Sequence, residues 1–439
     1  MSSWMTASAI YLTPLLLIFF YYGTKKKTRH NSSRQFLAQA QEDGLTEPAS
    51  MHPVIDTAKC LGCGSCVRAC PEHNVLGMID NKAHLVNPAD CIGHGVCMID
   101  CPHDAITLVF GTETRGVDIP ELSPEFETNI PGIFIAGELG GMGLIKNAIE
   151  QGRQAMDSIV KKTKASASNN KDVLDCLIVG SGPAGLAATL GAMEKKLNVV
   201  TIDQDAIGGT VSHFPRGKLV MTAPATMPMV GRVKFKEISK EKLMDFWLGL
   251  IEKHSVKINQ NEPMLDIQRN SDGSFGVITA KQTYQTKSVL LAIGRRGSPR
   301  KLGIDGEELS KVVYRLVDAE QYAGDDVLVV GGGDSALEAA CSIAELGSSR
   351  VTLSYRSETF GRAKQKNREW VNRLASNDQL RLLMSSTVKQ ISLEQVEIDF
   401  QGELLTLPNS AVIVCAGGVL PSPFLKKIGI EVSTKYGTQ

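Results

Sequence analysis

The sequence has no net charge and few aromatic residues. Its 439 residues include 47 basic and 47 acidic side chains, and aromatic residues make up only 5%. Because the charges cancel, nothing in the composition indicates nucleic acid or another polyanion as a partner. The 41 glycines and few aromatics are typical of an α/β nucleotide-binding protein, and the length allows two or three domains at roughly 150 residues each.

Charge is also absent from the first 24 residues. They contain an apolar run of about 20 residues, enough for a helix to span a bilayer, with Trp4 and Tyr21–Tyr22 where interfacial aromatics are expected. Lys25–Lys27 and Arg29 follow at once. The run therefore predicts a transmembrane helix at 5–23, single-pass in the inner membrane, with the soluble domains on the cytoplasmic side. A cleaved signal peptide is the alternative, but it needs positive charge before the run and a small-residue cleavage site after it, and neither is present.

Cysteines are few outside one short segment. Seven of the ten lie between Cys60 and Cys101, which favours metal ligation over a disulfide framework. Four have the C-x2-C-x2-C-x3-C-P spacing of an iron–sulfur motif: Cys60, Cys63, Cys66 and Cys70. A second run with the same spacing has a histidine at its second position: Cys91, His94, Cys97 and Cys101. A zinc site is the alternative, but zinc prefers two separated pairs of ligands.

The two runs resemble the bacterial two-cluster ferredoxin family and depart from it only at His94. In such runs three cysteines hold one cluster, and the cysteine before proline ligates the other cluster. One cluster is therefore expected to use Cys60, Cys63, Cys66 and Cys101. The other is expected to use Cys70, Cys91 and Cys97, together with whatever His94 offers.

Three interpretations of His94 are open. It ligates a [4Fe–4S] cluster, it lies near a [3Fe–4S] cluster, or there is no second cluster. Imidazole is a competent iron ligand that raises the potential, and Gly93 and Gly95 leave the loop free to bring the ring inward. A vacant site would leave Cys70, Cys91 and Cys97 without a role, so a second cluster is expected.

Two strand–glycine–helix units predict dinucleotide sites. The first, "VLDCLIVGSGPAGLAATLGAM", contains Gly180, Gly182 and Gly185, where a tight turn leaves a pyrophosphate at the helix N-terminus. Asp203 ends the next strand about 20 residues further on, where an acid binds the ribose hydroxyls. The motif is weak alone, but strand, helix and acid in register make it specific.

The second unit, "DDVLVVGGGDSALEAACSIAELG", has Gly331, Gly333 and Ala336 at the corresponding positions. Its next strand lacks the acid of an NADH site. The basic residues in and after that strand suit the 2′-phosphate of NADPH, which is favoured over NADH: Arg356, Arg362 and Lys364. The alternative is that these are solvated surface charges.

Two such sites in tandem resemble the thioredoxin reductase-like pyridine-nucleotide oxidoreductases. "LLAIGRRGSPRKLGIDGEE", with Gly294, and "VIVCAGGVLPSP" match that family's domain crossings, and "GGTVSHFPRGKLVMTAPATMP", with Gly209, is similar to the bacillithiol-disulfide reductase branch. The resemblance covers most of residues 111–439. It implies FAD and NAD(P) domains, bound FAD and NADPH, and a homodimer.

One segment is out of the family's order. The family's last FAD-domain segment is a Gly-Ile-Phe-x-Ala-Gly-Asp turn and a helix whose N-terminus faces the flavin. Its apparent equivalent here, "FETNIPGIFIAGELGGMGLIKNAIEQGRQAMDSI" at 126–159, precedes the FAD glycine motif. The resemblance implies a circular permutation, with Gly137 among the cofactor-binding residues and Glu138 at the family's aspartate position, facing the flavin ribityl chain. A fortuitous strand and helix is the alternative.

The redox cysteine of the family's disulfide reductases is missing. Val211 and Ser212 follow the Gly-Gly-Thr turn, Ala184 stands where the bacillithiol branch has cysteine, and the second unit has no Cys-x-x-Cys. Three other cysteines fall in predicted strands or a helix and are expected to be core residues: Cys176, Cys341 and Cys415. Thiol–disulfide exchange is therefore disfavoured.

An electron-transfer flavoenzyme remains, with no catalytic side chain expected. NADPH reduces FAD, two clusters take the electrons singly, and a quinone, cytochrome or ferredoxin is the carrier in either direction. A thiol–disulfide reductase with an unrecognised cysteine and a cofactor-binding redox sensor are the alternatives.

The expected fold class is α/β, with two Rossmann-like domains, a small α+β two-cluster ferredoxin domain and one transmembrane helix. The expected order is: 5–23 transmembrane helix, 24–51 tether, 52–110 ferredoxin domain, 111–160 permuted closing segment of the FAD domain, 161–171 linker, 172–300 FAD domain, 301–420 NAD(P) domain, and 421–439 return to the FAD domain.

Overall fold

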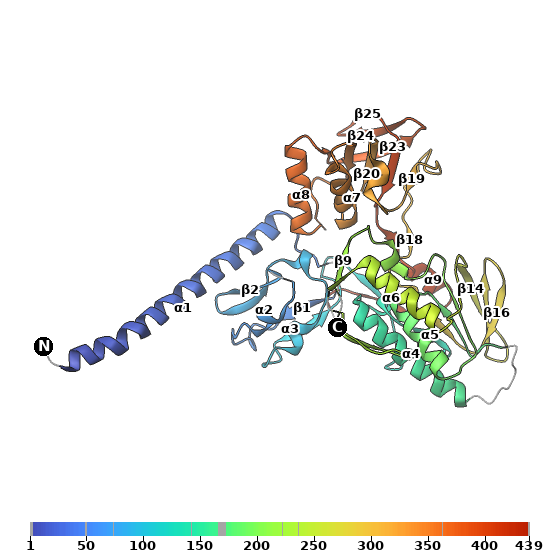
Figure 1. Ribbon diagram of the computed structural model, residues 1–439, viewed down its shortest axis with the longest axis horizontal. Helices are drawn as coiled ribbons and strands as arrows, with labels where there is room; N and C mark the ends of the chain where they lie inside the picture. The colour runs from blue at the N-terminus through green and yellow to red at the C-terminus, as the bar shows by residue number, and fades with distance from the viewer. Residues whose placement is uncertain are drawn as a thin grey trace. The chain divides into compact units, whose positions relative to one another are not determined.

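The chain folds into two compact units (Figure 1). The first comprises the residues up to Gly116 together with Tyr436 and Gly437, and the second is Val117–Lys435. The computed structural model describes residues 3–48, 51–72, 74–141, 143–165, 173–221, 223–235, 237–361 and 363–437.

After its first helix, the first unit contains one antiparallel strand pair, formed by its first and last strands. A hairpin of two strands lies between them in the chain. β1 pairs antiparallel with β4, and β2 pairs with β3 across a turn at Asp80–Asn81, both of which have positive φ. Four of the nine residues in its buried cluster are cysteines, so the sulfur atoms lie inside the unit. Its elements are α1 (Ser3–Glu42), β1 (His52–Ile55), α2 (Ser65–Ala69), β2 (Leu76–Ile79), β3 (Lys82–Leu85), η1 (Pro88–Asp90), α3 (Val96–Ile99) and β4 (Ile106–Val109).

α1 continues through residues 24–42, which the sequence analysis assigned to a polar tether. Ser33 packs against Gly77 of β2, where a Cβ would lie 2.5 Å from the Ser33 Oγ. The Ser33 hydroxyl accepts a hydrogen bond from the Met78 N–H at 3.2 Å, and Arg34 pairs with Asp80 at 2.9 Å. The second half of the helix is therefore held on the β2–β3 hairpin.

Within the described residues, no helix is both long enough and apolar enough to cross a membrane. In α1, the exposed apolar run whose side chains are described extends from Tyr11 to Tyr22 and is followed by Lys25–Lys27. The predicted transmembrane helix at 5–23 and the predicted inner-membrane localisation are therefore wrong.

The second unit contains two five-stranded parallel sheets. The first has the order β13-β8-β7-β17-β6. β6 (Ile133–Ile135) precedes β7 (Cys176–Val179) in the chain but pairs with β17 (Val289–Leu291) at the sheet edge. The helix after β6, α4 (Ile145–Ala165), packs on α5 (Pro183–Glu194) (Figure 1). A segment ahead of the first glycine motif thus supplies that motif's sheet with a strand and a helix.

The other elements around this sheet are small strands, turns and one further helix. Trp247 of α6 is the largest fully buried side chain there and packs with aliphatic residues of α5 and η3. These elements are η2 (Glu138–Gly140), β8 (Val199–Ile202), η3 (Gly209–His213), β9 (Leu219–Met221), β10 (Ala225–Met227), β11 (Gly231–Val233), β12 (Glu237–Ser239), α6 (Lys240–Lys253), β13 (Ile258–Asn259), β14 (Met264–Arg269), β15 (Phe275–Thr279) and β16 (Thr283–Thr286).

The second sheet follows the second glycine motif and has the order β19-β26-β20-β21-β22, again all parallel. A three-stranded antiparallel sheet follows it in the chain. The elements are β19 (Val312–Val313), η4 (Ala319–Tyr322), β20 (Asp326–Val330), α7 (Asp334–Ala344), β21 (Arg350–Ser354), α8 (Gln365–Ser376), β22 (Arg381–Leu383), β23 (Ser386–Ile391), β24 (Gln395–Phe400), β25 (Glu403–Pro408) and β26 (Ala411–Val414).

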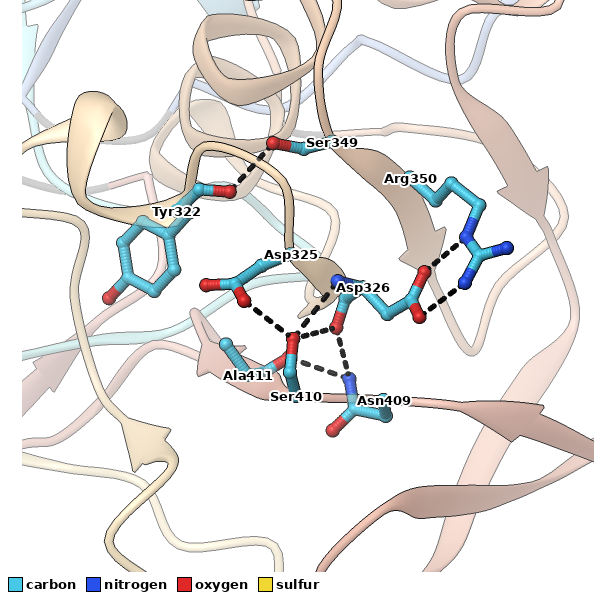
Figure 2. A network of polar contacts seen from close by, with 8 residues as sticks. All are labelled: Tyr322, Asp325, Asp326, Ser349, Arg350, Asn409, Ser410 and Ala411. Carbon is cyan, nitrogen blue, oxygen red and sulfur yellow. Dashed lines mark hydrogen bonds and ion pairs between the residues drawn. The ribbon is translucent and has the colours of Figure 1, made fainter.

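A polar network holds the amino ends of β20 and β26 in register (Figure 2). The Asn409 side-chain amide donates to the carbonyl oxygens of Asp326 and Ala411 at 3.0 and 2.7 Å. Arg350, at the start of β21, pairs with the Asp326 carboxylate. The glycine turn lies at the opposite, carboxyl end of β20, so this network is structural.

Short strand pairs complete the second unit. β18 (Ser298–Pro299) and β27 (Gly418–Val419) pair where the chain crosses between the two parts, and α9 (Ser422–Lys427) follows. The last strand, β28 (Val432–Lys435), pairs antiparallel with β5 (Val117–Pro120), with Lys435 opposite Val117. The end of the chain thus returns to the point where the second unit begins.

Candidate functional site

One cavity in the first unit is lined by four of the candidate iron ligands. Cys60 and Cys63 lie on the loop before α2, Cys66 lies in α2, and Cys101 follows α3. The cavity and its open mouth together hold about 310 Å³ of empty space, and Ile55 and Ile106 contribute to the walls. These four cysteines are the set that the motif spacing assigns to one cluster, although they come from both runs.

A second cavity, of about 370 Å³, is lined by the other four: Cys70, Cys91, His94 and Cys97. In the part of the chain that the structure describes, the two cavities share no lining residue. Glu72 also lines the second cavity, a position that the sequence analysis did not single out. His94 therefore faces the same space as three cysteines, as a ligand at that corner would require.

The chemistry of these donor atoms fits a metal cluster. Burial raises the pKa of the Cys66 and Cys97 thiols to about 11 each, and neighbouring cysteines raise it as well. Thiolates crowded in this way repel one another and are poorly solvated, so they need a cationic centre between them. Cys63 differs, because hydrogen bonding from the Ser65 backbone lowers its pKa at the exposed rim.

The first glycine turn, between β7 and α5, is too tightly packed for side chains. A Cβ on Gly185 would lie 1.8 Å from the Gly180 carbonyl oxygen, and one on Gly209 would lie 3.0 Å from the Gly182 Cα. Gly180 has a φ of +104°, which glycine adopts readily and other residues do not. Because Gly182 has no side chain, the N-terminus of α5 can accept an anion such as a pyrophosphate.

Asp203, predicted to bind a ribose, accepts three hydrogen bonds within the protein. Its Oδ2 accepts from the Ser181 N–H at 2.6 Å and from the Ser181 hydroxyl at 2.7 Å, and its Oδ1 accepts from the Asp205 N–H at 3.0 Å. The side chain is buried. The carboxylate thus holds the glycine turn against the end of β8, and a ribose would share its remaining acceptor capacity.

Gly137 and Glu138 lie at the end of β6, next to the end of β17. The Gly137 N–H donates to Gln151 Oε1 at 2.9 Å, which ties the turn to α4. The Glu138 carboxyl lies beside Gly294 and accepts a hydrogen bond from the Arg295 backbone. Burial raises the pKa of Glu138, and the nearby Arg295 counteracts this. The fold therefore brings Gly137, Glu138 and Gly294 together.

The second glycine turn has the same compactness. A Cβ on Gly331 would lie 2.4 Å from the Cys415 carbonyl oxygen, and Ala336 is fully buried beneath the turn. A Cβ on Gly333 would have no neighbour within 4 Å, so there is open space at the N-terminus of α7. Arg356 follows β21 and is exposed, whereas Arg362 lies outside the described residues.

The three remaining cysteines are unsuited to thiol chemistry. Cys176 and Cys341 are 0% exposed, and burial raises the pKa of each to about 12. Cys415 is half-buried, and burial raises its pKa to about 11. A reactive thiolate needs a lowered pKa, so none of the three has that environment.

One pair of residues near the first turn gave no signal in the sequence. His213, the last residue of η3, lies with its Nε2 3.4 Å from the Asp205 carboxylate. The two residues are separated by a glycine turn, and neither belongs to a spacing motif. Only the folding of η3 back toward the end of β8 brings them together.

Comparisons with known proteins agree with this architecture. Residues 177–438 match the family model for pyridine nucleotide-disulphide oxidoreductases, and residues 52–102 match that of a 4Fe-4S dicluster domain. The chain is 24% identical to bacilliredoxin reductase Bdr of Bacillus subtilis over 270 residues, which cover 60% of this chain and 82% of that protein.

A second relative matches over a shorter stretch. The chain is 31% identical to ferredoxin–NADP reductase of Streptococcus sanguinis over 192 residues, 43% of this chain and 56% of that protein. It therefore matches about half the length of that relative. Among solved structures, bacillithiol disulfide reductase Bdr from Bacillus cereus shares the fold with a TM-score of 0.50 and 24% identity, covering 58% of this chain and 81% of that one.

The family match covers more than half of the sequence and contains both glycine turns and the strands of the two parallel sheets except β6 and the first residue of β7. The dicluster match coincides with the two cysteine-lined cavities. The chain belongs to the pyridine nucleotide-disulphide oxidoreductase family and is an FAD-dependent pyridine-nucleotide oxidoreductase that also carries a 4Fe-4S dicluster domain.

Proposed function

We propose that the protein transfers electrons between NADPH and a ferredoxin-type carrier through FAD and its own two iron–sulfur clusters. The observation that carries this proposal is the sorting of eight candidate ligands into two cavities, in a chain whose other thiols are buried or half-buried. The Streptococcus sanguinis relative, named a ferredoxin–NADP reductase, supports NADP and ferredoxin as partners.

Each nucleotide would be bound at one helix N-terminus. Gly180, Gly182 and Gly185 would hold the FAD pyrophosphate at the N-terminus of α5, and Gly331 and Gly333 would leave room for the NADPH pyrophosphate at the N-terminus of α7. The exposed Arg356 is available for the 2′-phosphate. Bound FAD supplies the means to accept a hydride and release electrons one at a time. The role of the protein is to bind and orient these groups.

The ligand sets follow the two cavities. The first cluster uses Cys60, Cys63, Cys66 and Cys101, and the second uses Cys70, Cys91, Cys97 and His94. Ligation by His94 is favoured because it lines the second cavity together with the three cysteines. A three-iron cluster with His94 nearby remains the alternative, and spectroscopy separates the two.

A circular permutation of the FAD domain accounts for the chain order. β28 and β5 form the two strands of an antiparallel pair with Lys435 opposite Val117, as in a hairpin whose connection has been opened. The segment from β5 through α4 would then be the original C-terminal end of the domain, joined now to β7. This assigns residues 117–165 to the FAD domain and leaves the ferredoxin domain before them.

Quinones and cytochromes are not proposed as partners. They were expected only because of the predicted membrane helix, and no described helix meets the length and apolarity that a membrane span requires. A ferredoxin-type carrier needs no such helix. Electron flow in either direction is compatible with the site, since hydride transfer between pyridine nucleotide and flavin is reversible.

Low-temperature electron paramagnetic resonance of the anaerobically purified chain, before and after stoichiometric NADPH, tests the proposal. Signals of reduced four-iron clusters are expected after NADPH is added. A three-iron signal in the isolated protein would exclude His94 as a ligand. If NADPH bleaches the flavin and the clusters stay oxidised, electron flow from NADPH to the clusters is excluded.

A thiol–disulfide reductase is the second candidate, favoured by the similarity to Bdr. Cys415 is the most exposed thiol of the second unit and the one such an activity would have to use. Because burial holds its pKa near 11, Cys415→Ser is expected to keep its NADPH oxidation rate within about two-fold. The rate is measured with an artificial one-electron acceptor. A loss of more than ten-fold would favour thiol chemistry, and Cys341→Ala is the control for a purely structural effect.

A further inference from the structure

A chain of hydrogen bonds holds His213 close to the first glycine turn. Ser181 of the turn donates to Asp203 from its N–H and its hydroxyl, and Asp203 accepts the Asp205 N–H at 3.0 Å. The Gly208 N–H, directly before η3, donates to the Ser181 carbonyl at 3.2 Å. The Asp205 carboxylate then pairs with His213 Nε2 at 3.4 Å. The loop from Asp203 to Gly208, which leads into η3, is therefore tied to the first glycine turn, and His213 is held to this loop by Asp205.

His213 also lies near basic residues of the segment that joins the two glycine-turn parts of the second unit. Besides Asp205, the charged groups that act on it are Arg315, which follows β19, and Arg296, in the crossing before β18. Arg296 also acts on Glu138, at the end of the first sheet, and on Cys415, whose carbonyl contacts the second glycine turn. His213 is only 15% exposed, although Asp205 beside it is 46% exposed. The pair thus connects this region to solvent.

The proposed reaction leaves a proton to be removed. Oxidation of NADPH yields NADP⁺, two electrons and one proton. Two one-electron carriers take both electrons and no proton, so the proton must pass to a base and then to solvent. A histidine held by a carboxylate is a common base for such a transfer.

We infer that the His213–Asp205 pair receives this proton and delivers it to solvent, an inference that rests on the proposed function. The Nε2–H of His213 donates to the Asp205 carboxylate, which leaves the lone pair of Nδ1 to accept the proton. Asp205 positions the ring and stabilises the imidazolium. In the reverse direction the same pair supplies the proton that NADP⁺ reduction requires.

The electrostatics agree with a base that is neutral at rest. Burial lowers the pKa of His213, and Arg315 and Arg296 lower it further, whereas Asp205 raises it. A neutral imidazole is ready to accept a proton. Turnover limited by this step should therefore be full above the pKa of His213 and should fall as the pH drops through it.

The test is the pH profile of steady-state turnover of the full-length holoprotein with NADPH and a one-electron acceptor. His213→Gln is expected to lower turnover by about 100-fold and to abolish the acid limb of the profile. Asp205→Asn removes the group that raises the pKa, so the limb should move to lower pH. Arg315→Gln removes a group that lowers it, so the limb should move to higher pH. His254→Gln, a change of another half-buried histidine of the unit, should leave the profile unchanged.

The opposite shifts separate proton transfer from a structural role. Equal shifts in Asp205→Asn and Arg315→Gln, or an unmoved acid limb in His213→Gln, would overturn the inference. Reduction of the clusters of the wild-type chain by NADPH is measured in parallel. If the wild type reduces its clusters and the variants fail these tests, the inference is wrong and the proposed function is unaffected. If the wild type leaves its clusters oxidised, the proposed function falls and the inference with it.

Discussion

Gly152→Ala is expected to destabilise the second unit strongly. Gly152 lies in α4, where a Cβ would be 2.1 Å from the Ala184 carbonyl oxygen and 2.8 Å from its carbonyl carbon. The obstacle is the backbone of α5, which cannot rotate away as a side chain can. Separating the two helices would open the core that contains Met156 and Ile159 of α4 and Ala188 of α5. A cost above about 3 kcal/mol follows, since overpacking against backbone exceeds ordinary core overpacking.

Thermal unfolding of the holoprotein, followed by the fluorescence of released flavin, measures this effect. A loss of about 3 kcal/mol corresponds to a decrease in Tm of about 6–12 °C for a domain of this size. Gly249→Ala is the matched control, because Gly249 lies exposed in α6 and a Cβ there would meet no atom within 4 Å. That substitution should stabilise its helix by about 0.5–1 kcal/mol. Equal Tm values for the two variants would contradict the packing of α4 on α5.

The same result bears on the proposed permutation. Residues of α4 belong to a segment that precedes the FAD glycine motif, separated from β7 by residues 166–175. The glycine motif at α5 is proposed to hold the flavin. If α4 is an integral part of the same domain, a substitution that separates α4 from α5 must release the flavin. A Gly152→Ala chain that keeps its flavin while α4 detaches would mean that the segment is an accessory to the domain.

The iron–sulfur motifs were predictable because they are local. Three ligands of each cavity come from one run of seven residues or fewer, and the short helices α2 and α3 begin after Gly64 and Gly95, both with positive φ. Spacing alone therefore predicts which side chains converge. The role of Glu72 in lining the second cavity was not predictable, because nothing in its spacing marks it as a cavity residue.

The positions of the dinucleotide motifs were predictable, but the hydrogen bonds made by their residues were less predictable. Asp203 falls at the end of the strand after the first turn, as expected, yet it is engaged by Ser181 and Asp205. The motif requires an acid there and does not specify what else the acid binds. The His213–Asp205 pair depends on the fold of η3, and the sequence gives no periodicity for a short loop.

The N-terminal helix differs from its prediction for two physical reasons. The polar composition of residues 24–42 suggests a solvated tether, but composition does not report a contact between two small residues such as Ser33 and Gly77. The apolar run before residue 24 has about 20 residues, and the predicted membrane span depended on that number. No described helix, α1 included, is both long enough and apolar enough to cross a membrane.

Cys101→Ser is expected to remove the cluster whose ligands otherwise come from the other run. Cys101 lines the cavity of Cys60, Cys63 and Cys66, so the cluster that it helps to hold should be lost, and about half of the iron with it. Cys70→Ser is the mirror variant, since Cys70 lines the cavity of Cys91, His94 and Cys97. Both cysteines precede a proline, so the two changes perturb similar backbones.

Iron content and electron paramagnetic resonance of protein labelled with ¹⁵N-histidine distinguish the variants. Cys101→Ser should retain the cluster with histidine coupling, or the three-iron signal if His94 is not a ligand. Cys70→Ser should lose that signal and retain the other. The reverse assignment would mean that each run holds its own cluster. Cys415→Ser, in the second unit, should keep both signals.

The loss should extend to the fold of the first unit. Four of the nine residues of its buried cluster are candidate iron ligands, and the others include only small or medium aliphatic side chains. Without the metal, these cysteines would be buried thiols with no bonds to iron. Burial already raises the pKa of Cys66 and Cys97 to about 11. Because binding of the metal and folding of such a unit are coupled, a chain with both changes, Cys70→Ser and Cys101→Ser, should lose the native structure of residues 52–110 and keep the flavin-binding unit folded. Limited proteolysis should then cut within residues 52–110 and leave the flavin bound.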